Sequence, residues 1–253
     1  SIDFGGTVAV TGAAASLLDL AATGAVTQSA GTLSAAALRV DGASVQIDRA
    51  GNSLPQIQAT ATGNVSVATD GATTILGTRS SAGNVAVSAG GINLSDAAGT
   101  MAVQAAGTVS LTATNGDIAG ASGLAAVQAP VLNATASGEV TLTGDNAVGT
   151  LAAIAGSGVT FDNTTALIAG ATGAGGTAIA GDVTLSALSL RLNNLLATGT
   201  VDLTARAGTI DQAAGVRLAA GILRAAATGS VILDAANPDG TARNQILDSD
   251  ALS

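Results

Sequence analysis

Carboxylates are the only side chains here that are numerous enough to suggest acid–base or metal chemistry. The chain of 253 residues contains 17 Asp and Glu, eight Lys and Arg, and no His or Cys. Without His or Cys it cannot build a Ser-His-Asp or Cys-His arrangement, nor a metal site that uses imidazole or thiolate. Paired carboxylates could still act as general acid and base on a polysaccharide, and stacked Asp oxygens could bind calcium.

The Asp residues are spread along the chain instead of clustered. About one falls in each repeat unit described below: Asp48, Asp70, Asp96, Asp117, Asp145, Asp162, Asp182 and Asp202. We interpret them as a solvated face that keeps the protein soluble. The sequence therefore predicts no catalytic residue, no metal ion and no cofactor, and a polysaccharide lyase or hydrolase that uses Asp is the alternative.

Two glycine-rich stretches resemble functional motifs but lack the residues that those motifs need. Gly120–Gly123 has the form of a nucleophile elbow, but the chain contains no His to serve as the base. Gly170–Gly176 lacks the Lys-Ser/Thr pair of a phosphate-binding loop. We interpret the first as a turn and the second as a long surface loop.

Hydroxyl side chains are the second candidate for a functional site. They alternate with aliphatic residues at Ser110 and Thr112, Thr141 and Thr143, Thr184 and Ser186, and Thr204. If the aliphatic residues point inward, these hydroxyls point outward, and on one flat face they could bind a glycan or ice. The alternative is that Thr and Ser simply suit exposed strand positions. Ala86, Asp162 and Asp202 interrupt the array.

The elements that carry these residues are short strands. A unit of Gly, a polar residue, Val, any residue and an aliphatic residue begins at Gly6, Gly63, Gly83, Gly107, Gly138, Gly181, Gly199 and Gly229. Apolar residues at every second position predict a half-buried strand, and the leading Gly predicts a turn with positive φ. The predicted inward residues are Val8, Val10, Val65, Val67, Val109, Leu111, Val140, Leu142, Val183, Leu185, Val201 and Leu203.

The units belong to a longer internal repeat. Gly107–Ala113 returns 92 residues later as Gly199–Ala205, with six of seven residues identical. This spacing divides the chain into 15–106, 107–198 and a partial copy, 199–253. Repeats of this kind bury their apolar faces only by stacking. We therefore predict one all-β domain, a right-handed parallel β-helix of about ten coils, which makes a rod roughly 48 Å long.

A helix is the competing prediction for one Ala-rich segment, because Ala is the best helix former. Gly215–Ala227 places aliphatic residues four apart, but its repeat partner Gly123–Ser137 contains Pro130 near its centre. A proline inside a helix costs about 3 kcal/mol. Since equivalent segments should fold alike, we predict strands for both.

Asn52, Asn146 and Asn244 recur at equivalent coil ends, and we interpret them as structural turn residues.

Composition and charge exclude several partners. Only 1% of residues are aromatic and the net charge is −9, so nucleic acid is not an expected partner. No run of 18 apolar residues predicts a membrane-inserted helix. No signal peptide is recognisable at Ser1–Gly6, and neither end carries a recognisable cap. We therefore expect an excerpt of a longer chain that associates end to end through unpaired strand edges.

The Gly-x-Val-x-Leu-x-Ala unit at Gly107–Ala113 and the Gly-x-Ile that follows at Gly116–Ile118 resemble a known repeat texture. It is that of filamentous-haemagglutinin-like exoproteins of bacterial two-partner secretion. The resemblance implies a secreted β-helical rod or filament at the bacterial cell surface, of adhesin type, with host-surface glycans, other cells or itself as partner. It supplies no functional residue for this chain.

Overall fold

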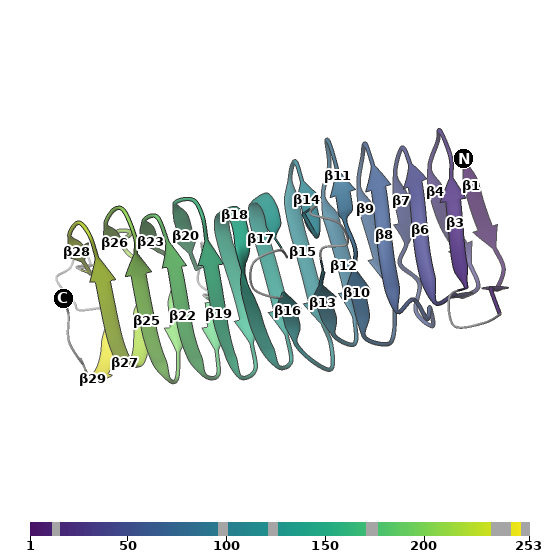
Figure 1. Ribbon diagram of the computed structural model, residues 1–253. Coiled ribbons are helices and arrows are strands. Elements are labelled where there is room, and N and C mark those ends of the chain that lie inside the picture. The colour runs from purple at the N-terminus through teal and green to yellow at the C-terminus, as the bar shows by residue number, and fades with distance from the viewer. Residues whose placement is uncertain (12–15, 96–100, 121–125, 171–176, 234–243, 249–253) are drawn as a thin grey trace.

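The chain folds into a single stack of strands, and the residues that the structure describes contain no helix. The computed structural model describes residues 1–11, 16–95, 101–120, 126–170, 177–233 and 244–248. Nearly all of the strands in these ranges join one 27-stranded sheet, in which every pairing is parallel and connects neighbouring coils. The sheet winds into a β-helix of about ten turns, which confirms the predicted fold class. Figure 1 shows the turns side by side along a rod, with β1 and β28 at opposite ends.

One set of strands, ladder A, runs from the first coil into the middle of the rod. Its pairings join each strand to the strand one coil later. Its members are β1 (Ile2–Gly5), β4 (Val26–Ala30), β7 (Val45–Ile47), β9 (Val65–Ala68), β12 (Val85–Ala89), β15 (Thr108–Ala113), the later part of β17 (Val127–Ala136) and the end of β18 (Glu139–Ala155).

A second set, ladder B, follows the whole rod. It contains β3 (Leu17–Ala21), β6 (Ala37–Gly42), β8 (Gln56–Ala61), β10 (Thr73–Ile75), β13 (Ile92–Leu94), β16 (Ile118–Gly120), the start of β18, β19 (Gly158–Asn163), β22 (Asp182–Ala187), β25 (Thr200–Ala205) and the end of β27 (Leu218–Ala227). A short third set, ladder C, contains the end of β8, β11 (Thr78–Ser80), β14 (Val103–Ala105), the start of β17 and the middle of β18.

Beyond β18, the position of ladder A is taken by two short strands in each coil. One series is β20 (Leu167–Ala169), β23 (Leu190–Leu192), β26 (Ile210–Gln212) and β28 (Val231–Ile232), and the other is β21 (Thr177–Ile179), β24 (Leu195–Ala197), the start of β27 and β29 (Gln245–Asp248). Near the first coil, β2 (Val8–Ala9) pairs with β5 (Leu33–Ser34) apart from the main sheet. The Ala-rich segments for which helix was the competing prediction contain β17 and β27. Because both are strands, the prediction of strands for these segments is confirmed.

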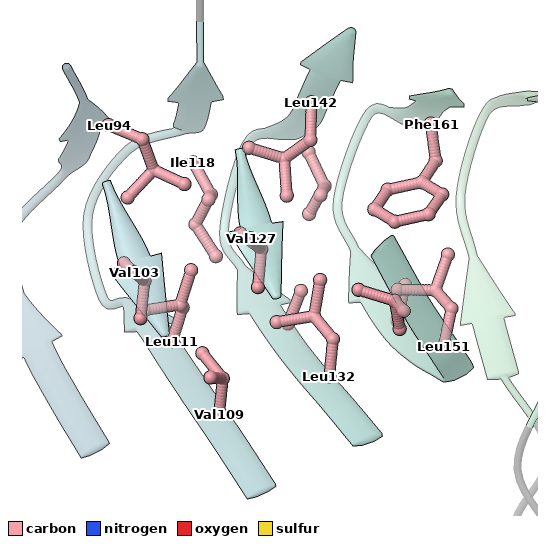
Figure 2. Close-up of a cluster of buried hydrophobic side chains, with 14 of the residues drawn as sticks. Leu94, Val103, Val109, Leu111, Ile118, Val127, Leu132, Leu142, Leu151 and Phe161 are labelled. Atoms are coloured by element: carbon pink, nitrogen blue, oxygen red, sulfur yellow. The ribbon is translucent and has the colours of Figure 1, made fainter. Parts of the chain in front are cut away.

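The core is a narrow column of aliphatic side chains, one layer from each coil. Among the predicted inward residues, all from Val65 to Leu203 are at most 2% exposed. Val8 and Val10 are only partly buried, because they lie in the first coil. Figure 2 shows Leu111 and Leu132, which come from neighbouring coils of ladder A, reaching into this column together with Leu142 from ladder B. The ring of Phe161 is stacked one coil beyond Leu142. Small aliphatic residues fill such a column without large side chains, which explains the low aromatic content.

Several of the glycines that begin a unit lie close to an atom of the preceding coil, and the prediction of positive φ at these glycines was wrong. Positive φ occurs in the described part of the chain at other glycines, such as Gly31 and Gly51. A Cβ added to Gly107 would lie 2.2 Å from Oδ1 of Asn84, and one on Gly138 would lie 1.9 Å from Oδ1 of Asp117. At these two glycines, a polar side chain from the preceding coil therefore occupies the space that a Cβ would fill.

That polar side chain also accepts a backbone hydrogen bond from the next coil. The amide of Thr108 donates to Oδ1 of Asn84 at 2.7 Å, and the amide of Glu139 donates to Oδ1 of Asp117 at 2.8 Å. Asp182 accepts from Thr200 in the same way at 2.7 Å. Glycine and polar residue thus act as a pair across two coils, since the side chain can reach the amide only where no Cβ blocks it.

Candidate functional site

The predicted hydroxyl face does not exist as one array. Ser110 and Thr112 lie on β15 in ladder A, where Ser110 is opposite Ala86 and Asn133. Thr112 lies in a row of three hydroxyls with Ser88 and Thr135. The next residue in that row is Ile154, which is 53% exposed and ends the hydroxyl row.

The other candidate residues lie in ladder B. Thr141 and Thr143 are on β18, Thr184 and Ser186 on β22, and Thr204 on β25. Thr141 is opposite Thr160, which is opposite Thr184, and the row then continues into Asp202. The prediction that all these hydroxyls stack together is wrong. The units that carry them lie in ladder A up to β15 and in ladder B from β18 onward.

Part of the ladder B surface is already occupied by an arginine. Arg206 donates to Oγ of Ser186 at 2.6 Å, and its guanidinium also contacts the Asp162 carboxylate and the backbone carbonyl of Asn163. These contacts reach across two coils and link the side chains on the outer face. Ser186 and Asp162 therefore take part in contacts between coils. A ligand could bind to these two side chains only by displacing the guanidinium of Arg206.

Several carboxylates pair with an arginine on the adjacent coil. Arg39 and Asp19, Arg191 and Asp211, and Arg224 and Asp202 are directly opposite each other on neighbouring coils, with N–O distances of 3.8 to 3.9 Å. Such cross-strand pairs avoid the repulsion of like charges. Within the described ranges, no group of three or more acidic side chains could hold a metal ion.

Hydrogen bonds from the side chains of Ser29 and Thr27 lower the pKa of Asp3.

The recurring asparagines are structural, but for a different reason than turn conformation. Asn52 and Asn146 are fully buried. Oδ1 of Asn146 accepts the amide of Val127 at 2.9 Å, and its Nδ2 donates to the carbonyls of Leu142 at 3.0 Å and Asp162 at 2.8 Å. Asn52 and Asn244 accept the amides of Leu33 and Leu218 in the same way. Each side chain completes backbone hydrogen bonds at a corner of the coil.

Sequence reasoning missed one concave surface. A groove of about 880 Å³ lies over ladder C, and its polar lining includes Thr60, Arg79, Gln104 and Gln128. These residues follow one another along a single outer row of the rod. The only signal in the sequence is their spacing of about one coil, which can be recognised once the strand register is known.

Three predictions involve residues outside the described ranges. They are the turn at Gly120–Gly123, of which only Gly120 is described, the loop at Gly170–Gly176, of which only Gly170 is described, and the solvated position of Asp96. The described residues contain no helix that is long and apolar enough to cross a membrane.

Comparisons of the whole chain with known proteins give no match. This holds for protein-family models, for curated proteins and for solved structures. The fold and the surfaces described above are therefore the basis for any functional proposal.

Proposed function

We propose that this protein is a secreted structural rod of adhesin type at the bacterial cell surface. The rod spaces or presents an adhesive region, or assembles into filaments through contacts with other copies. The observation that carries the proposal is the unbroken sheet of 27 strands, in which each coil hydrogen-bonds to the next. Stability in such a stack adds coil by coil, so that length increases without a new core.

The outer surface and the repeat texture support this role. Outward positions carry mainly small polar residues and Asp, several of them paired with Arg on the adjacent coil. Gly-x-Val-x-Leu units such as Gly107–Leu111 resemble those of filamentous-haemagglutinin-like exoproteins, which are rods of this kind. From that resemblance we propose host-surface glycans or other cells as partners, and no enzymatic activity.

A deletion in register tests the spacing role. Val85, Val109 and Leu132 are opposite one another in ladder A, so removing residues 85–131 deletes two coils and joins the chain in register. We expect a folded rod that is shorter by about 10 Å in small-angle scattering. Cells that carry this version should still attach.

A matched deletion separates length from disruption. Removing residues 73–84 takes away β10 and β11 without completing a coil, and should prevent stacking. If the register deletion folds but attachment is abolished, the two deleted coils bind the target themselves and the spacer role is wrong. Polysaccharide cleavage by the intact protein that a single Asp-to-Asn change abolishes would instead support the enzyme alternative.

A glycan-binding or ice-binding hydroxyl face is the second candidate. The row Thr141, Thr160 and Thr184 favours it, since three hydroxyls repeat at the spacing of the coils. Changing Thr141, Thr143, Thr184 and Thr204 to Ala tests it directly. A rod should keep its fold and its cell attachment after these changes, whereas a hydroxyl-face binder should lose glycan or ice binding.

A further inference from the structure

The groove over ladder C is long and follows the axis of the rod. Its lining residues come in short sets from six consecutive coils, from Asp41 on β6 to Ala147 on β18. A second hollow of about 480 Å³ shares Asp41, Gly42 and Thr62 with it and extends the surface to Ala21–Thr23. Seven coils have six spacings of about 4.8 Å between them, which makes a groove roughly 29 Å long. Figure 1 shows β6, β8, β11 and β14 in this order along the rod.

Each coil contributes the same construction to this groove. One residue points inward, and its backbone forms the floor, as at Ala61, Ser80 and Ala105. Outward residues on either side form two walls. One wall is the row of Thr60, Arg79, Gln104 and Gln128, and the other is built from small residues such as Ser81 and Ala106. The side chains of Arg79, Gln104 and Gln128 lie in the groove and are half-buried.

The backbone of the floor is already satisfied, so that a ligand must be recognised by side chains. The amide of Ser81 donates to the carbonyl of Ala61, and the amide of Ala106 donates to the carbonyl of Ser80, both at 3.1 Å. An extended peptide therefore finds no free strand edge here. With no aromatic residue in the lining, the groove also offers no apolar anchor for peptide side chains.

The side chains of the polar wall leave donors and acceptors available. Nε2 of Gln104 donates to Oε1 of Gln128 at 2.7 Å, which orients the two amides. The amide NH₂ of Gln128 and the amide oxygen of Gln104 take no part in this hydrogen bond, and both can bind a ligand. Arg79 makes no ion pair with any described residue, unlike Arg39, Arg191, Arg206 and Arg224. It is also the only cation among the lining residues.

We propose that this groove binds a linear polysaccharide that carries carboxylate groups. Arg79 binds one carboxylate through two parallel N–H donors, the geometry that a guanidinium favours. Gln104, Gln128 and Thr60 bind the hydroxyls of neighbouring sugars. Asp41, about 10 Å from Arg79 along the row, repels a carboxylate at that end and so fixes where along the groove the charge lies.

Affinity measurements on the whole chain test the proposal. Polygalacturonate is the probe, titrated by calorimetry, and dextran is the neutral control. We expect Arg79→Gln to weaken polygalacturonate binding at least tenfold, because it removes a charge-assisted hydrogen-bonded pair. Arg79→Lys should recover part of the loss. The matched control is Arg39→Gln, an exposed arginine on β6 outside the groove, which should bind as the unchanged protein does.

A second variant acts on the shape of the groove and not on its charge. Ala106→Leu fills the opposite wall and should also weaken binding, with the circular dichroism spectrum unchanged. The proposal is overturned if polygalacturonate does not bind, if dextran binds equally well, or if Arg79→Gln and Arg39→Gln have the same effect. None of these outcomes depends on whether the protein acts as a spacer at the cell surface.

Discussion

Replacing Asn146 by Ala should destabilise the middle of the rod more than any exposed change of the same size. The side chain is fully buried and makes four hydrogen bonds, all to backbone groups. Its loss leaves the amide of Val127 without an acceptor and the carbonyl of Asp162 without this donor. Each unsatisfied buried group costs about 1–3 kcal/mol, so we expect a loss of about 2–6 kcal/mol.

Urea unfolding followed by circular dichroism measures this loss, and Asn93→Ala is the matched control. Asn93 is an exposed residue on β13, and its replacement should change the free energy of unfolding by no more than about 0.5 kcal/mol. Amide hydrogen exchange locates the effect, because the Val127 amide should exchange faster in the Asn146 variant. If both variants unfold at the same urea concentration, the buried amide does not support the corner and our reasoning is wrong.

Three further changes test the core, the coil contacts and the first coil. Leu111→Asp buries a charge without a partner in the core column and should unfold several coils, seen as loss of the β-sheet signal and rapid proteolysis. Gly138→Ala places a Cβ 1.9 Å from a carboxylate oxygen and should lower the thermal midpoint, whereas Gly71→Ala, with nothing within 4 Å, should not. Ser29→Ala should raise the pKa of Asp3, measured by NMR titration, because it removes a hydrogen bond to the carboxylate. The pKa of Asp3 is lower in the folded protein than in the unfolded chain. The stability that Asp3 contributes is therefore present above the pKa of the unfolded chain and is lost as the pH falls through the pKa of the folded protein.

The sequence predicted the strands and their inward residues because side-chain direction alternates strictly along a strand. Once Val109 and Leu111 are assigned to one face, Ser110 must lie on the other, and this is what their burial shows. The repeat also favoured a strand over a helix at β27, because the equivalent segment one repeat earlier, β17, contains Pro130. These are local properties, which need no knowledge of the neighbouring coil.

What the sequence could not supply depends on contacts between coils. The same unit occupies ladder A at Val109 and ladder B at Val201, and the change of ladder falls between the unit on β15 and the unit on β18. Nothing within the unit encodes that shift, and so the hydroxyls were wrongly placed together. The close approach at Gly107 and the corner hydrogen bonds of Asn146 also involve partners about one coil away. The groove was missed because its walls come from separate coils.

The strand β18 has a consequence for how the rod forms. It is 17 residues long and contributes to all three ladders, and it pairs with β17 for eight residues and with β19 for five. Most other coils are assembled from shorter strands joined by turns, which must find their partners separately. A chain that forms β17 and β18 first acquires a nearly complete template, onto which coils can be added in both directions. We therefore expect the folding nucleus to lie at the centre of the rod, with growth proceeding outward toward β1 and β28.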